Sequence, residues 1–332
     1  MILSKMATVW GILSAGKISH DFVTALRSLE NHEVKVVAAK NLDNAKKFAA
    51  LHKIPVILDN YEDIITQGVD VVYCGSLNTQ HYELVKLLLE NKIPVLCEKP
   101  LTMYAKHTQA LVKIARENKV FLMEAIWSRF LPVYDELRKN LPSIGEIQQV
   151  NVTFGSKEIK KCERVTKPEL GGSSILDIGV YCVNFAQLIF QDEVPVQIQA
   201  VGDISSDGVD FQTAMILKYR SGKFASLTTS LTADLPCEAI VHGVNGSIKL
   251  ANPFWCPESL DVNGRKIHLP FPETLLPCNY VNSSGLRYEA MHVRECLQKG
   301  LTESPVLPLD ATLKIAEIME ICLKKVGAKQ WQ

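Results

Sequence analysis

The sequence carries no excess of either charge, because Lys and Arg together number 36 and Asp and Glu also number 36. A chain without net charge has no general electrostatic attraction for nucleic acid or for an anionic membrane. No apolar run approaches the roughly 20 residues that a bilayer span requires. Residues 1–6 also lack the long apolar region of a secretory signal peptide. We therefore expect a cytoplasmic protein that binds neither nucleic acid nor a membrane.

Cysteine and histidine motifs are missing as well. The nine cysteines contain no Cys-x-x-Cys pair, and several of them, such as Cys74, Cys97 and Cys182, lie within apolar runs. This distribution is typical of reduced thiols that serve as small core residues. The sequence also has no His-Glu-x-x-His motif and no tight cluster of His and Cys, so we expect no metal.

The glycine-rich fingerprint of a dinucleotide site is incomplete. An apolar strand at 8–13 precedes Ser14-Ala-Gly16-Lys-Ile-Ser19, and a helical pattern follows to about Leu29. Ser14 and Ser19 occupy the positions of the first and third Gly in G-x-G-x-x-G. Gly16 is retained at the position where the backbone approaches a pyrophosphate in front of a helix N-terminus. The pattern predicts a dinucleotide-binding turn, with an ordinary strand-to-helix turn as the alternative.

Strands and helices alternate through the rest of the first half. Four further apolar strands are predicted at 33–39, 69–75, 95–98 and 120–123, and helices at 43–52, 80–90 and 105–118. Five apolar strands separated by helices predict a doubly wound parallel sheet. The length of 332 residues favours two domains, and we place the first at 1–125.

The residue that follows the second strand bears on cofactor choice. An acid there binds the ribose 2′-hydroxyl of NAD, whereas a cation accommodates the 2′-phosphate of NADP. The sequence has Lys40-Asn41 at this point, and the first acid is Asp43. We therefore favour NADP, with an exposed lysine of no special role as the alternative.

Two further strand ends carry polar groups. After the strand at 95–98, Glu98-Lys99-Pro100 places a carboxylate and an ammonium at the carboxyl edge of the sheet, where ligands bind; a surface charge pair is the alternative. After the strand at 69–75, we expect Asn78 or Thr79 to cap the next helix. His81 follows in the first turn, where it faces either the cofactor or solvent.

The second half, 126–332, is dominated by strands. We predict them at 147–155, 196–203, 211–219, 223–231, 238–242 and 247–250, with turn signals such as Asn263-Gly264 between apolar segments. This indicates an α+β domain with a large, open, mostly antiparallel sheet. Few helices remain to cover such a sheet, so we expect a homodimer that buries it. The last helix, 310–326, is expected to pack back on the N-terminal domain.

One helix within this half carries a candidate catalytic pair. The helical pattern at 176–190 follows Gly171-Gly172 and contains Asp177 and Tyr181, which are four residues apart and share one face. Asp177 lies in the first turn, where the helix dipole favours a carboxylate. The glycines permit close approach of the backbone to a ligand. A capping acid and an amphipathic tyrosine are the alternative interpretation.

Aromatic residues are few, at 7% of the chain. Four of them are predicted in or beside loops, where an aromatic side chain requires more explanation than in a core: Trp127, Phe154, Trp255 and Tyr280. Core packing remains the alternative for each.

The order of these motifs resembles the glucose–fructose oxidoreductase and inositol dehydrogenase (Gfo/Idh/MocA) family. The resemblance rests on Ser14-x-Gly16, Asn78-x-x-His81, Glu98-Lys99-Pro100, and Gly171-Gly172 followed by Asp177 and Tyr181. It covers nearly the whole chain, with one departure, since most members carry His at the position of Tyr181. The resemblance implies a homodimer formed through the C-terminal sheet. It implies cofactor contacts from Ser14, Gly16, Lys17, Ile18, Lys40, Asn78, His81, Glu98 and Lys99. It also places Trp127, Phe154, Trp255 and Tyr280 around a flat, apolar substrate.

The resemblance further implies an NADP-dependent oxidoreductase. Its expected reactions are oxidation of trans-dihydrodiols of aromatic hydrocarbons to catechols, and of D-xylose or related aldoses to the lactone. A phenol, with an ordinary pKa near 10, is a poor base at neutral pH unless a nearby cation stabilises the phenolate. We therefore assign Tyr181 as proton acceptor, Lys99 as its activator and Asp177 as the group that orients one or both of them; Lys99 as the base stays open. The alternatives are a dehydrogenase or reductase of the same fold for another polyol, sugar or dicarbonyl, and a non-catalytic NADP-binding sensor.

Overall fold

A computed structural model describes residues 7–191 and 193–329, which form two compact units. The first unit comprises the chain up to Leu101 together with His107–Phe130 and Phe271–Leu309. The second comprises Thr102–Lys106, Leu131–Pro270 and the chain from Asp310 onward. The division therefore differs from a single boundary near residue 125, because the chain returns to the first unit after the second sheet is complete.

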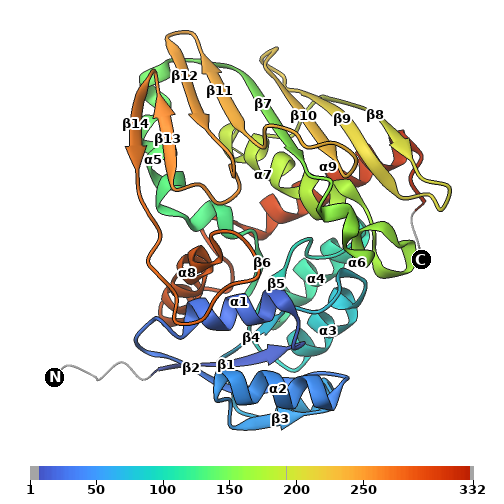
Figure 1. The fold of residues 1–332 in the computed structure, drawn as a ribbon, viewed down its shortest axis with the longest axis vertical. Helices are drawn as coiled ribbons and strands as arrows, with labels where there is room; N and C mark the ends of the chain where they lie inside the picture. The colour runs from blue at the N-terminus through green and yellow to red at the C-terminus, as the bar shows by residue number, and fades with distance from the viewer. Residues whose placement is uncertain (1–6, 192, 330–332) are drawn as a thin grey trace. The chain divides into compact units, whose positions relative to one another are not determined.

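The first unit is built on a parallel sheet of six strands, ordered β3-β2-β1-β4-β5-β6 (Figure 1). The strands are β1 (Thr8–Leu13), β2 (His32–Ala38), β3 (Val56–Leu58), β4 (Val71–Cys74), β5 (Val95–Glu98) and β6 (Leu122–Ala125). The predicted doubly wound sheet is confirmed. Five of its strands were predicted, and β3 was missed because it is an edge strand of three residues, none of them fully buried.

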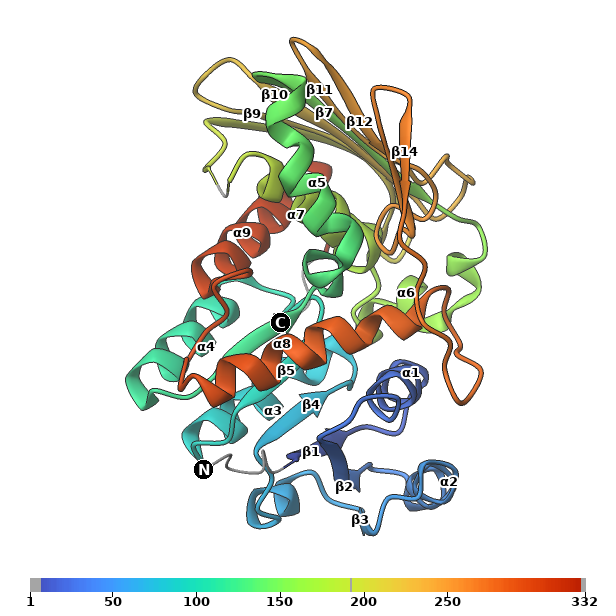
Figure 2. The same cartoon turned by 90° about the vertical axis from the view of Figure 1, so that its left-hand side faces the viewer.

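Helices flank this sheet and complete the core of the first unit. They are α1 (Lys17–Leu26), α2 (Leu42–His52), α3 (Asn78–Glu90), α4 (Ala105–Asn118) and α8 (Leu286–Gln298), with short 3₁₀ turns η1 (Glu62–Thr66), η2 (Trp127–Phe130) and η7 (Ser283–Gly285). The late helix α8 packs beside α1, as both views show (Figures 1 and 2). Strands β4 and β5 are buried at every residue, which explains why their sequences are apolar up to Glu98, the last residue of β5.

The second unit is built on a sheet of eight strands, ordered β14-β13-β12-β11-β7-β10-β9-β8. The strands are β7 (Ile147–Gly155), β8 (Gln197–Ile204), β9 (Asp210–Lys218), β10 (Phe224–Ser230), β11 (Ala239–Gly243), β12 (Gly246–Leu250), β13 (Ser259–Val262) and β14 (Arg265–His268). All neighbours are antiparallel except β7 and β10, which are parallel. The open, mostly antiparallel sheet is confirmed, and the hairpin β13–β14 around Asn263-Gly264 was missed as a pair of strands.

Helices α5 (Pro132–Asn140), α7 (Val180–Ile189) and α9 (Leu309–Val326) lie on one face of this sheet (Figures 1 and 2). The unit also contains the short helix α6 (Glu163–Thr166), a π-helical segment Ile175–Gly179 and short turns η3 (Leu141–Ile144), η4 (Ile159–Lys161) and η5 (Pro168–Leu170). Alternate residues of β9, Thr213, Met215 and Leu217, are buried, and the residues between them are exposed. One face of the sheet is therefore covered and the other carries exposed residues.

Two long helical stretches belong to this unit. Helix α9 is grouped with it from Asp310 onward, and its packing on the N-terminal domain stays a prediction. The stretch Pro168–Ile189 is long and apolar enough to cross a membrane by length and composition, but 94% of its most apolar part is buried. That burial is typical of a core helix.

Candidate active site

The turn after β1 has the geometry of a dinucleotide-binding turn although two of its glycines are serines. Ser14 has φ = 79°, a left-handed conformation that favours glycine. Gly16 caps α1 with φ = −84° and ψ = 178°, which any residue can adopt. A Cβ on Gly16 would lie 3.6 Å from Ser14 Oγ and 4.0 Å from Gly75 O, so no internal contact demands glycine here. The open space in front of the helix is therefore what the glycine preserves.

The N-terminus of α1 fits a phosphate group. Its cap makes no side-chain hydrogen bond, and its first turn contains no acid. Uncapped N–H groups and the helix dipole at such an end attract an anion. Lys17, which is exposed, and Ile18 are the first two helical residues. The residues present thus fit the pyrophosphate of a dinucleotide.

Ser19 stands where the fingerprint has its third glycine, which permits close packing of helix on strand. Ser19 is fully buried, and a Cβ on Gly75 would lie 2.3 Å from its Oγ. The close packing of helix on strand is therefore retained by a glycine at another position. Gly75, directly after β4, leaves the space that the side chain of Ser19 occupies.

The end of β2 carries no carboxylate. Lys40 is exposed, and its Nζ lies 6.0 Å from the centre of the Tyr61 ring. The side chain of Asn41 accepts a hydrogen bond from the Asn44 N–H and so caps α2. Asp43 is exposed in the first turn of that helix. This leaves Lys40 as the ionisable side chain directly after the strand.

The end of β4 differs from expectation at the helix cap and at His81. Leu77 is the N-cap of α3, and Asn78 is its first helical residue, so the cap predicted at Asn78 or Thr79 is wrong. His81 is only 1% exposed, which excludes the solvent-facing alternative. Its Nδ1 lies 2.9 Å from Pro100 O and its Nε2 lies 3.1 Å from Ser76 O. His81 thus links the turns that follow β4 and β5.

The end of β5 separates the roles of Glu98 and Lys99. Glu98 is buried, and its carboxylate accepts hydrogen bonds from Tyr73 Oη (2.7 Å) and from the Lys99 N–H (3.2 Å). Burial raises the pKa of Glu98, while the bond from Tyr73 and the charge of Lys99 oppose the rise. Glu98 therefore orders the backbone on which the partly exposed Lys99 is carried.

A second acid lies near Glu98 and was not noticed in the sequence. Glu289 of α8 is fully buried, and neither carboxylate oxygen has a hydrogen-bond partner among the described residues. Burial, with a further contribution from the charge of Glu98, raises the pKa of Glu289 well above its ordinary value. Two neighbouring buried carboxyl groups cannot both ionise without a large cost, so a charge on Glu98 favours the protonated form of Glu289.

The fold also assembles a His/Cys cluster that the sequence spacing did not reveal. Ligand atoms of Cys74, His81 and Cys97 lie within 4.8 Å of one another, and all three residues are buried. Both ring nitrogens of His81 already face backbone carbonyls. Cys74 and Cys97 are register partners on neighbouring strands, which brings their thiols together without a metal.

In the second unit, the helical segment with Asp177 and Tyr181 begins as a π-helix, Ile175–Gly179, and continues as α7. Asp177 accepts a hydrogen bond from Arg164 Nη1 at 2.8 Å, an ion pair that the sequence analysis missed. A Cβ on Gly172 would lie 2.7 Å from Val165 O, so this glycine allows the chain to approach its own backbone. Internal packing thus explains Gly172, and a left-handed φ of 80° explains Gly171.

Two of the predicted aromatic residues gather around Tyr181. The ring of Phe154 lies 6.1 Å from that of Tyr181 and is stacked on Trp255 at 3.9 Å with an interplanar angle of 13°. Phe254, which is fully buried, supports both rings edge to face. Phe154 and Tyr181 are 4% and 8% exposed, and Trp255 is half-buried. Together they form an aromatic cluster beside the phenol, in which Trp255 is the most exposed ring.

The other two aromatics belong to the first unit. Trp127 is buried, whereas Tyr280 is 43% exposed. The loop that carries Tyr280 is held on α1 by the buried Asp21, which accepts hydrogen bonds from the N–H groups of Asn279 (2.8 Å) and Tyr280 (2.9 Å). Asp21 had no signal in the sequence, because its partners are more than 250 residues away.

The structure thus sorts the predicted site residues into two groups. The first unit holds Ser14, Gly16, Lys17, Ile18, Lys40, Asn78, His81, Glu98, Lys99, Trp127 and Tyr280. The second unit holds Phe154, Asp177, Tyr181 and Trp255. Nucleotide-binding features collect in one unit, and the phenol with its aromatic neighbours in the other.

Comparison with known proteins agrees with this division. Residues 9–126 match the sequence model of an oxidoreductase family with an NAD-binding Rossmann fold, and residues 142–249 match the GFO/IDH/MocA C-terminal domain. A protein of Xenopus tropicalis named trans-1,2-dihydrobenzene-1,2-diol dehydrogenase is 43% identical over 97% of this chain and 99% of its own. The chain belongs to the Gfo/Idh/MocA oxidoreductase family. The human protein of the same name is 40% identical to this family member over 97% of the chain and 98% of its own.

Solved structures show the same fold. A levoglucosan dehydrogenase in complex with NADH and levoglucosan aligns with a TM-score of 0.83 over 97% of both chains, at 17% identity. KijD10, a 3-ketoreductase from Actinomadura kijaniata in complex with NADP and TDP-benzene, aligns with a TM-score of 0.82 over 97% of this chain and 98% of its own, at 21% identity. The family resemblance read from the sequence motifs is confirmed, and the nucleotide turn described above belongs to an NAD-binding Rossmann domain.

Proposed function

We propose that this protein is an NADP-dependent dehydrogenase that oxidises trans-dihydrodiols of aromatic hydrocarbons to catechols, and D-xylose or related aldoses to the lactone. The observation that carries the proposal is the 40–43% identity, over 97% of the chain, to proteins named trans-1,2-dihydrobenzene-1,2-diol dehydrogenase. Oxidation of one hydroxyl of such a diol gives a ketone that tautomerises to the catechol. Oxidation at C1 of an aldopyranose gives the lactone.

The aromatic cluster in the second unit, with its half-buried Trp255, supports a flat, apolar substrate. Phe154 and Trp255 are stacked with their rings nearly parallel, next to Tyr181. Aromatic rings pack favourably in offset or edge-to-face arrangements, so a dihydrodiol ring can extend this group. Packing on the same aromatic cluster also suits the apolar face of a pyranose. The substrate hydroxyl would then lie near the phenol of Tyr181.

The cofactor assignment rests on the first unit. Gly16 and the uncapped N-terminus of α1 would hold the pyrophosphate, and Lys40 would hold the 2′-phosphate that distinguishes NADP. When bound, the nicotinamide supplies the hydride acceptor for the carbon that is oxidised. The absence of a carboxylate directly after β2 removes the group that would repel the 2′-phosphate.

Proton transfer is assigned to Tyr181 and Lys99. Tyr181 takes the hydroxyl proton as hydride leaves the substrate, and the ammonium of Lys99 stabilises the phenolate. Arg164 holds Asp177 through an ion pair at 2.8 Å, so Asp177 acts as an oriented carboxylate at the start of the helix that bears Tyr181. In the reverse assignment Lys99 is the immediate base, and the two assignments differ in their pH profiles.

A spectrophotometric panel tests the activity directly. Dihydrodiols, aldoses, other polyols and dicarbonyls are offered with NADP and with NAD, or with the reduced forms for the dicarbonyls. We expect turnover of the dihydrodiols and of D-xylose with NADP. Turnover confined to another polyol, sugar or dicarbonyl would favour the same-fold alternative. Binding of NADP with no turnover of any compound would favour a non-catalytic sensor.

Variants test the catalytic pair. Tyr181→Phe keeps the ring and removes the ionisable oxygen, and we expect kcat to fall by about 10² to 10⁴-fold with NADP binding nearly intact. The kcat of Lys99→Met should fall similarly. The kcat of the double variant should be little lower than that of either single variant, because both groups serve one proton transfer. Removing the lysine charge should move the limb of the kcat–pH profile to higher pH. Tyr219→Phe makes the same chemical change at another buried tyrosine of the second unit and should keep normal turnover. Multiplicative losses in the double variant would contradict the coupled pair.

We also propose that two chains pair through the exposed face of the eight-stranded sheet. Apolar side chains are exposed on its three outermost strands at that edge: Val201 (72%) on β8, Ile216 (41%) on β9 and Phe224 (37%) on β10. An exposed apolar sheet face is typical of an interaction surface. Location in the cytoplasm stays a prediction from the sequence.

A further inference from the structure

A buried carboxyl group lies at the start of the helical segment that carries Asp177 and Tyr181. Asp210 is the first residue of β9 and is fully buried. The chemistry proposed above gives it no part, and the strand predicted from the sequence starts one residue later, at Phe211. A carboxylate is rarely buried without compensation, so its contacts call for an explanation.

One oxygen of Asp210 joins the helix to two strands. Its Oδ2 accepts hydrogen bonds from Ser174 Oγ at 2.7 Å and from the Ile175 N–H at 2.8 Å. The hydroxyl of Ser174 also lies 2.9 Å from Thr229 Oγ1 on β10. Ser174 and Thr229 are both fully buried. The first residues of the helical segment are therefore held against β9 and β10 by an interior network.

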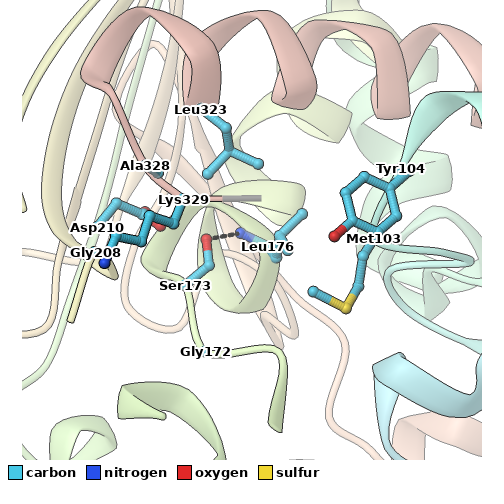
Figure 3. Close-up of a pocket in the computed structure, with 10 residues that line it drawn as sticks. All are labelled: Met103, Tyr104, Gly172, Ser173, Leu176, Gly208, Asp210, Leu323, Ala328 and Lys329. Carbon is cyan, nitrogen blue, oxygen red and sulfur yellow. Dashed lines mark hydrogen bonds between the residues drawn. The ribbon is translucent and has the colours of Figure 1, made fainter. Parts of the chain in front are cut away.

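The contact meets a specific requirement of the helix start. The first N–H groups of a helix have no partner within the helix. The Ile175 N–H is satisfied by Asp210, and the Leu176 N–H by Ser173 Oγ at 3.0 Å, the bond drawn in Figure 3. A negative charge at this end is also favoured by the helix dipole. Asp210 thus supplies a cap from a neighbouring strand.

The second oxygen of Asp210 shows that the acid is held at a cost. Its Oδ1 is buried and has no hydrogen-bond partner among the described residues. A small cavity lies beside this group, lined in part by Ser173, Leu176, Asp210 and Lys329 (Figure 3). Burial raises the pKa of Asp210, whereas the hydrogen bonds that its carboxylate accepts favour the charged form. The two bonds to Oδ2 are therefore what this buried group contributes.

We propose that Asp210 is a positioning residue that fixes the first turn of the helical segment on β9 and β10 and thereby sets where Asp177 and Tyr181 are presented. Asp177 follows the bonded Ile175 by two residues and Tyr181 by six, within one continuous helical segment. The effect on turnover rests on the proposed function, since Tyr181 acts there as proton acceptor. A displacement of about 1 Å of a reacting group can cost about 10²-fold in rate.

Asp210→Ala and Asp210→Asn test this inference. The alanine variant loses the acceptor, and we expect kcat to fall by 10- to 100-fold, with the dissociation constant of NADP unchanged within twofold. Asparagine keeps an oxygen that can accept from Ser174 and Ile175, so kcat should return to within threefold of the wild type. Met215→Ala is the matched control, because Met215 is buried on the same strand and cannot cap the helix. It should lower thermal stability and keep the turnover of the folded enzyme.

A second measurement does not depend on turnover. In protein labelled with [¹³Cζ]tyrosine, the resonance that disappears in Tyr181→Phe reports the surroundings of Tyr181. We expect this resonance to move in Asp210→Ala, to return in Asp210→Asn and to stay in place in Met215→Ala. If the wild type turns over no compound of the panel but the resonance responds in this way, the positioning role stands and the proposed function fails.

Three results would overturn the inference. They are an Asp210→Ala enzyme with wild-type kcat and an unmoved Tyr181 resonance, an Asp210→Asn enzyme as impaired as the alanine variant, and a Met215→Ala enzyme with an equal loss of turnover. If Asp210→Ala does not fold, Ser174→Ala replaces it. That change removes one of the two donors and should lower kcat by 3- to 10-fold while moving the same resonance, and normal behaviour of both would refute the role.

Discussion

Reversing the charge of Lys40 tests the cofactor assignment most directly. Lys40 is exposed directly after β2, and Asn41 is already engaged as the cap of α2. If the ammonium of Lys40 meets the 2′-phosphate of NADP, Lys40→Asp replaces an attraction by a repulsion. NAD lacks this phosphate, so its binding should change little.

The magnitude follows from the exposure of the lysine. Two unit charges 4 Å apart in water interact by about 1 kcal/mol. A phosphate monoester carries about 1.5 to 2 negative charges, so its attraction to Lys40 and its repulsion by an aspartate at this position each amount to about 1.5 to 2 kcal/mol before salt screening. Screening with a Debye length of about 8 Å reduces the total change to roughly 2 kcal/mol. We therefore expect NADP to bind at least tenfold more weakly, a change of about 1.4 kcal/mol or more.

The assay measures dissociation constants of NADPH and NADH from nicotinamide fluorescence, which requires no substrate. Lys47→Asp is the matched control, because Lys47 is an exposed lysine on the neighbouring helix α2 and gives the same change in net charge. Lys40→Ala removes the attraction without adding a repulsion, so its loss of NADPH binding free energy should be about half of that in Lys40→Asp. The affinity of the wild type for NADPH should fall with salt more steeply than its affinity for NADH. Unchanged NADPH affinity in Lys40→Asp, or an equal loss for NADH, would refute the assignment.

Three further predictions concern the loop, the pH dependence and the assembly. Asp21→Ala removes the acceptor of the Asn279 and Tyr280 N–H groups, so hydrogen exchange of these two amides should accelerate more than that of the β-sheet. Burial lowers the pKa of His52 to about 4, so the unfolded chain, with a pKa near 6.5, binds more protons between these values. The free energy of unfolding should therefore decrease as pH falls from about 6.5 to about 4. Denaturant titrations should show a smaller decrease for His52→Phe than for the wild type. Light scattering should give about twice the chain mass of 37.0 kDa, and Val201→Lys should give a monomer; a wild-type monomer at micromolar concentration would exclude the dimer.

The fold was largely predictable because its strands carry their own signals. Residues 95–98 and 147–155 were predicted with the bounds that the structure has, since one is an apolar run that ends at Glu98 before Pro100 and the other follows a strand pattern between clear turns. Strands β3, β13 and β14 have three or four residues, too few for a period to be recognised. The cap of α3 was misassigned to polar residues because backbone geometry, rather than side-chain type, sets Leu77 there.

The candidate site was predictable where chemistry lies in short motifs. Gly16, Lys40 and Lys99 were selected as candidates because each lies within three residues of the end of a strand, and the carboxyl ends of parallel strands meet at one edge. Arg164 and Asp210 were missed, because the one reaches Asp177 across 13 residues and the other reaches Ser174 across 36. No local pattern marks such a partner.

The sequence alone determined the family and the parallel nucleotide sheet and supplied the candidates for the reactive groups, because periodicity and short motifs are local properties of the chain. Tertiary structure decided which of those groups face inward and what holds them. Glu98 is turned toward Tyr73, and His81 is locked between two backbone carbonyls. The positive φ of Ser14 likewise follows from the turn and not from the residue type. Burial and hydrogen bonding depend on what the rest of the chain places nearby, and that information is distributed over residues far apart in the sequence.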